Sequence, residues 1–252
     1  MGKVNNGNGF QSEGILKAHD LVHWKQKQGL LKLPSPVSKV IISPQSGVIR
    51  NKRKFSSKLI KGLMGTHICT NATKGIYLSG GWGVGAPALI AICEELHALG
   101  AQEFYLAGIC GRLTIDVKEG ARLIAGAAIR EEGTSQHYLP VQADTLIHCP
   151  DVEHLTPLQQ SLSADRTTFV STDAPYRETV EKHRLWRNTG ATAIDMETAA
   201  LFAFGAFYNI KTISVAVAAD VLTEEKWTMC ANYAVVEKEL SSLINNLAET
   251  IQ

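Results

Sequence analysis

The chain has 252 residues, 45% of them hydrophobic, which is enough to bury the core of one large domain or two small ones. Its formal charge of +1, with both signs interspersed, gives no reason to expect nucleic acid, an anionic membrane or a polyacidic partner. Five cysteines without a CxxC pair indicate reduced thiols, and no apolar run approaches the ~20 residues that cross a bilayer, so we expect a soluble, cytoplasmic protein.

The first half of the chain alternates predicted strands with predicted helices. Residues 1–14 lack apolar periodicity and carry many turn-forming residues, so we expect a flexible segment there. Pro87 is well placed to open an amphipathic helix, which stops at Gly100. Short apolar runs predict buried strands over residues 37–43, 67–70, 75–79 and 104–109.

The second half continues this alternation and ends in an amphipathic helix. The predicted elements are strands over 121–129 and 168–171, a helical crossover over 147–164, an exposed helix over 180–188 and a C-terminal helix over 233–249. No Pro-, Ser- or Gly-rich linker divides the chain. The pattern therefore predicts a single α/β domain over residues 1–252, with a central mixed β-sheet flanked by helices.

One stretch places two acids where water is scarce. Residues 193–208 predict a helix that is small or apolar on every face after its first turn, and 212–220 predict a buried strand. Glu197 lies at the start of this helix, and Asp220 lies at the carboxyl end of the strand, the edge where open α/β sheets hold ligands. Each acid also has a simpler interpretation, Glu197 as an exposed first-turn acid and Asp220 as a helix N-cap.

A glycine-rich loop over residues 80–85 joins a predicted strand to a helix, so its backbone amides suit an anion or a sugar hydroxyl. Its G-x-G-x-G spacing disfavours a dinucleotide site. His148, Cys149 and His154 match no usual zinc spacing, and the chain has no G-x-S-x-G elbow. We therefore expect neither a metal site nor a serine hydrolase.

Four sequence blocks in this order resemble the nucleoside phosphorylase superfamily of the purine nucleoside phosphorylase and uridine phosphorylase type, which also includes nucleosidases. They cover residues 80–87, 107–111, 171–176, and 195–200 followed by 219–220. The resemblance implies a single-domain, three-layer phosphorylase/hydrolase-like fold.

The resemblance also implies roles for individual residues. Glu197 would accept hydrogen bonds from the ribose 2′ and 3′ hydroxyls, with Met196 packed beneath the sugar. Asp220 would hydrogen-bond or protonate the purine N7 as the base leaves, and such assistance is worth roughly 10²- to 10⁴-fold. The residues implied to frame the base are Ile109, Cys110, Gly111, Pro175, Tyr176, Ile194 and Trp227.

The usual phosphate-binding positions of the family are not kept. Residues 44–50 replace a Gly-Asp-Pro-x-Arg turn, Leu106 stands where an Arg is expected, and Ile109 stands where a Ser or Thr is expected. The basic run over 50–54 is either a solvated loop or an anion contact. The candidate replacements are Gly81, Arg50, Arg53, Arg112 or a basic residue of a neighbouring subunit.

We therefore predict an enzyme that cleaves the N-ribosidic bond of a purine or pyrimidine nucleoside to give the free base and ribose 1-phosphate. It would need no cofactor besides phosphate as co-substrate. The alternatives are a nucleosidase that uses water and a nucleoside-binding protein without turnover. Members of the family are usually oligomers, so we expect a homodimer or homohexamer in which His19 or His23 is a candidate for a group donated to the neighbouring site.

Overall fold

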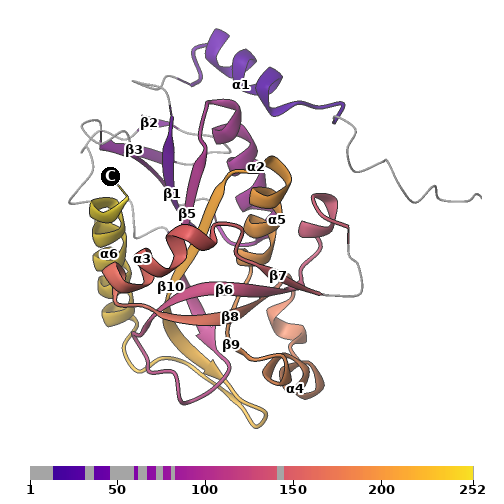
Figure 1. Cartoon of the computed structure of the whole chain (residues 1–252), viewed down its shortest axis with the longest axis vertical. Coiled ribbons are helices and arrows are strands. Elements are labelled where there is room, and N and C mark those ends of the chain that lie inside the picture. The colour runs from indigo at the N-terminus through magenta and orange to yellow at the C-terminus, as the bar shows by residue number, and fades with distance from the viewer. Residues whose placement is uncertain are drawn as a thin grey trace, which may run out of the picture.

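Figure 1 shows the computed structural model of the chain, which describes residues 14–31, 37–45, 60–61, 67–71, 76–80, 83–140 and 145–251. The predicted flexible segment 1–14 lies outside these residues except for Gly14. The described strands form one mixed sheet. They are β1 (Lys39–Ser43), β2 (Ile60–Lys61), β3 (His67–Asn71), β4 (Ile76–Gly80), β5 (Glu103–Arg112), β6 (Arg122–Glu131), β7 (Leu146–His148), β8 (Asp165–Thr172), β9 (Ala191–Asp195), β10 (Lys211–Leu222) and β11 (Trp227–Thr228).

The sheet closes on itself over part of its width. Its strand order is β11-β10-β6-β8-β9-β5-β1-β4-β3-β2, and β10 also pairs with β5, so that β5, β9, β8, β6 and β10 form a ring. The pairings of β5 with β1 and β10 are parallel, whereas those of β5 with β9 and of β6 with β10 are antiparallel. Segments far apart in the sequence therefore meet at one edge of the sheet.

Helices cover the sheet on separate sides (Figure 1). Helices α3 and α6 pack against each other, and α6 also packs on β5 and β10. On another side, α2 contacts both α1 and α5, and α5 packs on β6, β8 and β10. The helices are α1 (Ala18–Lys27), α2 (Ala86–Ala98), α3 (Val152–Leu162), α4 (Val180–Asn188), α5 (Thr198–Tyr208) and α6 (Tyr233–Thr250), with 3₁₀ turns η2 (Ser135–His137) and η3 (Pro175–Arg177).

This arrangement confirms the predicted fold class, a mixed sheet flanked by helices. The predicted amphipathic C-terminal helix is also confirmed, as α6, and the apolar stripe along it is buried. The stripe consists of Val236, Leu240, Leu243 and Leu247. None of the helices in the described part of the chain combines the length and the apolar character that a bilayer crossing requires.

Two predicted elements are wrong in part. Residues 193–195 belong to β9 rather than to the following helix, because Ala193 and Ile194 pair with both β5 and β8. The predicted crossover over 147–164 begins as strand β7, which pairs antiparallel with β6, and only Val152–Leu162 is helical. In both places strand pairing, a tertiary interaction, overrides the apolar pattern that suggested a helix.

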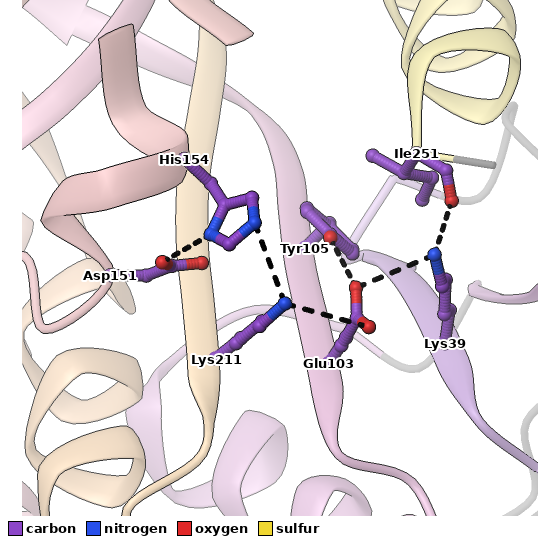
Figure 2. Close-up of polar contacts among 7 residues, drawn as sticks. All are labelled: Lys39, Glu103, Tyr105, Asp151, His154, Lys211 and Ile251. Carbon is purple, nitrogen blue, oxygen red and sulfur yellow. Dashed lines mark hydrogen bonds and ion pairs between the residues drawn. The ribbon is translucent and has the colours of Figure 1, made fainter. Parts of the chain in front are cut away.

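A charged network ties together the strand starts at the edge opposite the carboxyl ends of the parallel strands (Figure 2). Glu103, at the start of β5, lies 3.7 Å from Lys39 Nζ of β1 and 3.9 Å from Lys211 Nζ of β10. Tyr105 donates its hydroxyl to the same carboxylate at 2.7 Å, and Lys39 also donates to the carbonyl of Ile251 at 2.8 Å. Lys211 continues the network toward His154 and Asp151.

Helix α5 lies so close to β10 that one position on it has no room for a side chain. A Cβ atom on Gly205 would lie 2.6 Å from Thr212 Cγ2 and closer still to Thr212 Oγ1. Residues Thr198–Gly205 are all buried, so the helix cannot move outward without opening the core.

We expect Gly205→Ala to lower the free energy of unfolding by about 1–3 kcal/mol, because a well-packed core resists added volume. Urea unfolding followed by far-UV circular dichroism measures this. The double variant Gly205→Ala with Thr212→Ala should recover part of the loss, since it removes the two closest atoms. Equal stability of the single variant and the parent chain would contradict this account of the contact between α5 and β10.

Candidate active site

A cavity of about 690 Å³ opens at the carboxyl ends of the parallel strands. This is the size of a small-ligand pocket. Its lining comes from loops and strand ends that the closed sheet brings together: Pro44, Gln45, Val84, Ile109, Gly111, Pro175, Tyr176, Glu178, Ile194, Asp195, Met196, Glu197, Asp220, Leu222 and Trp227.

The turn between β9 and α5 is built on the partly buried carboxylate of Asp195. Its Oδ1 accepts hydrogen bonds from Ser171 Oγ at 2.6 Å and from the Glu197 amide at 3.3 Å. Its Oδ2 accepts from the amide of Thr198 at 3.2 Å and also from the Thr198 hydroxyl. Ser171 Oγ in turn accepts from the amide of Ala199 at 2.9 Å. These contacts satisfy the first amides of α5 and fix the direction of the chain at Glu197.

Glu197 points into the cavity from this turn and is only 6% exposed. Its Oε1 accepts from the Gly85 amide at 2.5 Å, at the start of α2, and its Oε2 accepts from the Met196 amide at 3.1 Å. Burial, and second the charge of Asp195, raise the pKa of Glu197 to about 7, although the two amides lower it. Both oxygens keep lone pairs for further donors.

Asp220 reaches the cavity from an irregular part of β10. The register between β5 and β10 shifts between Ala218 and Val221, and such bulges re-aim side chains beside functional sites. Trp227 Nε1 donates to Asp220 Oδ2 at 2.6 Å. Arg112, at the end of the neighbouring strand β5, donates its Nε hydrogen to the carbonyls of Ala219 at 2.9 Å and of Asp220 at 3.4 Å. The strand continues to Leu222, so Asp220 is not the N-cap of a helix.

The structure brings most of the predicted site residues together. The cavity is lined by Asp220, Met196, Glu197, Ile109, Gly111, Pro175, Tyr176, Ile194 and Trp227. Tyr176 is 99% exposed, so it stands at the rim and does not cover the interior. Neither His19 nor His23 lines the cavity of this chain, and a group donated by a neighbouring copy stays a prediction.

Two residues predicted for the base and phosphate sites, Cys110 and Arg112, are described by the structure but do not line the cavity. Cys110 alternates with Ile109 and Gly111 along β5, so its side chain is buried on the other face of the strand. Arg112 also donates to the carbonyl of Val117 at 3.0 Å, and a phosphate contact would require the guanidinium to leave its carbonyl partners. Gly81, Arg50 and Arg53 lie outside the described residues.

Sequence reasoning missed several residues that the structure places in the lining. They are Pro44, Gln45, Val84, Glu178, Asp195 and Leu222. A usable signal existed for two of them. Asp195 directly precedes the Met196–Glu197 pair, and Glu178 follows Tyr176 by two residues in a loop after a predicted strand.

The electrostatic character of the cavity is acidic. Its lining contains the carboxyl groups of Glu178, Asp195, Glu197 and Asp220, and no lysine or arginine among the residues that the structure describes. No group of three or more His, Cys, Asp or Glu within the described ranges is arranged to hold a metal ion. The cavity therefore suits a ligand that is rich in hydrogen-bond donors or that develops positive charge.

The sequence of this chain is similar to those of known proteins of one family. The model of the phosphorylase superfamily matches residues 50–251. A guanosine phosphorylase of Halorubrum lacusprofundi is 34% identical over 126 residues, which is 48% of this chain and 51% of that protein. A uridine phosphorylase of Treponema pallidum is 31% identical over 150 residues, which is 53% of this chain and 57% of that protein. The chain thus spans about half the length of these relatives.

The fold is shared with solved structures of low sequence identity. A purine nucleoside phosphorylase from Toxoplasma gondii, solved in complex with immucillin-H, has a TM-score of 0.68 and 18% identity over 85% of this chain and 90% of that one. A uridine phosphorylase from Vibrio fischeri has a TM-score of 0.65 and 21% identity over 86% of this chain and 90% of that one. The chain belongs to the phosphorylase superfamily, as the family match over most of its length shows.

The raised pKa of Glu197 predicts a pH-dependent stability. Its pKa is about 7 in the folded chain against an ordinary value of 4.5, so between these values the folded state binds more protons than the unfolded state. We therefore expect the free energy of unfolding to fall as the pH rises through this window. Urea unfolding of the parent chain and of Glu197→Gln, at several pH values, measures the effect. The decline should be smaller in Glu197→Gln, and parallel pH profiles for the two proteins would contradict it.

Proposed function

We propose that this protein cleaves the N-ribosidic bond of a nucleoside, with phosphate as the attacking group. The observation that carries the proposal is that Glu197 and Asp220, which come from different segments of the chain, line one cavity. The names of the relatives support the same class of reaction, because guanosine and uridine phosphorylases both act at a bond between ribose and a base.

The ribose would lie beside the turn between β9 and α5. Glu197 is held by the amides of Gly85 and Met196, so its carboxylate is fixed before any ligand arrives. Its remaining lone pairs match the two adjacent hydroxyls of a ribose. Met196 lines the same part of the cavity and offers an apolar surface for the sugar.

The base would lie toward Asp220, among the apolar side chains of Ile109, Ile194 and Leu222. When the bond between the anomeric carbon and the base nitrogen breaks, its electron pair leaves with the base. A hydrogen bond or proton from Asp220 to the base would neutralise that charge. Trp227 donates to Oδ2 of Asp220, which leaves Oδ1 for the base.

The sugar becomes cationic as the base departs, and the acidic lining would stabilise this positive charge. An oxygen of the attacking group then bonds to the anomeric carbon. Phosphate gives ribose 1-phosphate, whereas water gives ribose.

One observation favours water as an alternative attacking group. No basic side chain among the described residues lines the cavity, and Leu106, at a position where the family places an Arg, is 3% exposed within the core. A phosphate dianion would need cations from elsewhere, and Arg50 and Arg53 lie in the part of the chain that is not described. A nucleosidase is therefore the second candidate function.

The deciding experiment incubates the protein with guanosine, inosine, adenosine and uridine, each with and without phosphate, and quantifies free base, ribose and ribose 1-phosphate. We expect base release that requires phosphate and yields ribose 1-phosphate. Base release that is indifferent to phosphate would replace the proposal with hydrolysis. Nucleoside binding without base release would indicate a binding protein.

Asp220→Asn serves as the catalytic control: it should abolish purine turnover, while nucleoside binding is kept.

A second prediction concerns the close packing around Asp220. A Cβ atom on Gly111 would lie 2.8 Å from Ile194 Cγ2 and 3.5 Å from Asp220 Oδ2, so Gly111→Ala must displace a wall of the base site. We expect kcat/KM for the nucleoside to fall by roughly 10- to 100-fold, because small misplacements of reacting groups are costly. Gly108→Ala is the matched control, since its Cβ would meet only Gln45, at an ordinary 3.8 Å. Equal kcat/KM for both variants would contradict the proposed tight fit.

A further inference from the structure

The backbone pairing between β5 and β10 ends just past the bulge that carries Asp220. After the register shift, the two strands pair once more, at Arg112 and Val221, and this is their last pair in the described part of the chain. The next residues are Leu113 and Leu222, whose carbonyl groups lie beyond this ladder. Asp220 therefore lies directly before the point where backbone pairing between the two strands stops.

The imidazole of His183, on α4, connects the two carbonyl groups beyond the ladder. Its Nε2 lies 3.1 Å from the carbonyl oxygen of Leu113 and 3.1 Å from that of Leu222. Because a carbonyl oxygen only accepts, we assign the ring hydrogen to Nε2, where both carbonyls share it. Nδ1 is buried and has no hydrogen-bond partner among the described residues, so a hydrogen there would lack an acceptor. His183 is only 6% exposed, so water does not compete for these contacts.

The Leu222 carbonyl belongs to the hairpin that carries Trp227. Leu222 pairs antiparallel with Trp227, and Thr223 closes the turn between them by donating its amide to the Lys226 carbonyl at 3.0 Å. The side chain of Trp227 is 57% exposed, so burial does little to hold it. Its Nε1 nevertheless donates to Asp220 Oδ2 at 2.6 Å. The position of this donor therefore depends on the backbone of the hairpin.

The Leu113 carbonyl gives the imidazole a fixed reference on the other strand. The Leu113 amide donates to the Thr192 carbonyl at 2.9 Å, which extends the pairing of β5 with β9, and its side chain is buried. Helix α4 is also fixed, because Trp186 on the same helix is completely buried. His183 thus links a mobile element, the hairpin, to two elements that the core holds in place.

A second contact joins α4 to the same hairpin, but it lies in solvent. Arg184 Nε and Nη2 each lie 2.8 Å from Glu224 Oε2, and the two side chains are 61% and 43% exposed. Ion pairs this exposed contribute little. Of the two contacts, we therefore expect the buried one of His183 to determine where the hairpin lies.

We propose that His183 is a positioning residue for Asp220. By holding the carbonyls of Leu113 and Leu222 on one N–H group, it places the hairpin so that Trp227 donates to Asp220 and orients its carboxylate toward the cavity. The consequence for turnover rests on the proposed function. The contact between Trp227 and Asp220 is a property of the chain itself, so it can be measured without a nucleoside.

The test compares His183→Leu, which keeps the approximate volume but removes the donor, with His183→Gln, whose amide nitrogen stands near the position of Nε2. The readout is the indole N–H resonance of Trp227 in ¹H–¹⁵N spectra of the full chain, assigned by its absence in Trp227→Phe. Arg184→Gln is the matched control, since it removes the exposed contact of α4 with the same hairpin. Far-UV circular dichroism verifies that each variant is folded.

We expect the Trp227 resonance to move upfield or broaden in His183→Leu, because its hydrogen bond to Asp220 weakens. It should stay close to its parent position in His183→Gln and in Arg184→Gln. If His183→Leu does not fold, His183→Asn replaces it, because its amide nitrogen stands near the position of Nδ1 and does not reach both carbonyls. An unchanged Trp227 resonance in the folded variant without the donor would overturn the proposal, and so would an equal change in Arg184→Gln.

Kinetics with a nucleoside then test the consequence for turnover. In His183→Leu, we expect kcat to fall roughly 10- to 100-fold with a smaller change in KM, because a misplaced catalytic group costs rate while Glu197 still holds the sugar. His183→Gln should recover most of kcat. An unchanged kcat in His183→Leu would overturn the positioning of Asp220 for the reaction. If the parent chain releases base from no nucleoside, the proposed function fails, and the Trp227 resonance alone decides the role of His183.

Discussion

The structure around the cavity depends on one constraint, the hydrogen bonding of two carboxylates, one buried and one partly buried, at the turn between β9 and α5. Asp195 is surrounded by hydroxyl and amide donors from Ser171 and from the start of α5, and this fixes the backbone that carries Glu197. Glu197 in turn accepts the Gly85 amide, so it also links the start of α2 to the start of α5. Carboxylates away from water need such donors, and here the donors come from the starts of two helices, α2 and α5, which therefore lie next to each other at the turn.

The second acid is positioned by different means. The bulge in β10 turns Asp220 toward the cavity, Arg112 donates to the carbonyls of Ala219 and Asp220 within that bulge, and Trp227 donates to one carboxylate oxygen of Asp220. Arg112, which resembled a candidate phosphate ligand in the sequence, therefore supports the strand that carries Asp220. Because β5 pairs with both β9 and β10, the segments that carry the two acids lie on either side of one strand, and both acids line the cavity.

The charge of the cavity connects this geometry with the chemistry that we propose. A lining with four carboxyl groups favours hydroxyl and N–H donors and a sugar that becomes cationic, and it disfavours a free anion. The identity of the attacking group thus depends on cations that the described part of the lining does not provide. The four carboxyl groups can therefore bind the nucleoside, whereas binding of an anionic attacking group requires other residues.

The sequence by itself determined the α/β class, the buried stretch that carries Glu197 and Asp220, and the C-terminal helix, because apolar periodicity and acids at element ends are local signals. It could not place β9 and β7 or the bulge at Asp220, which depend on pairing with strands distant in the chain. Nor could it tell that Cys110 faces away from the cavity while Glu178 faces into it. Only the tertiary structure decided which side chains share the cavity, because the closed sheet sets the direction of each strand and loop.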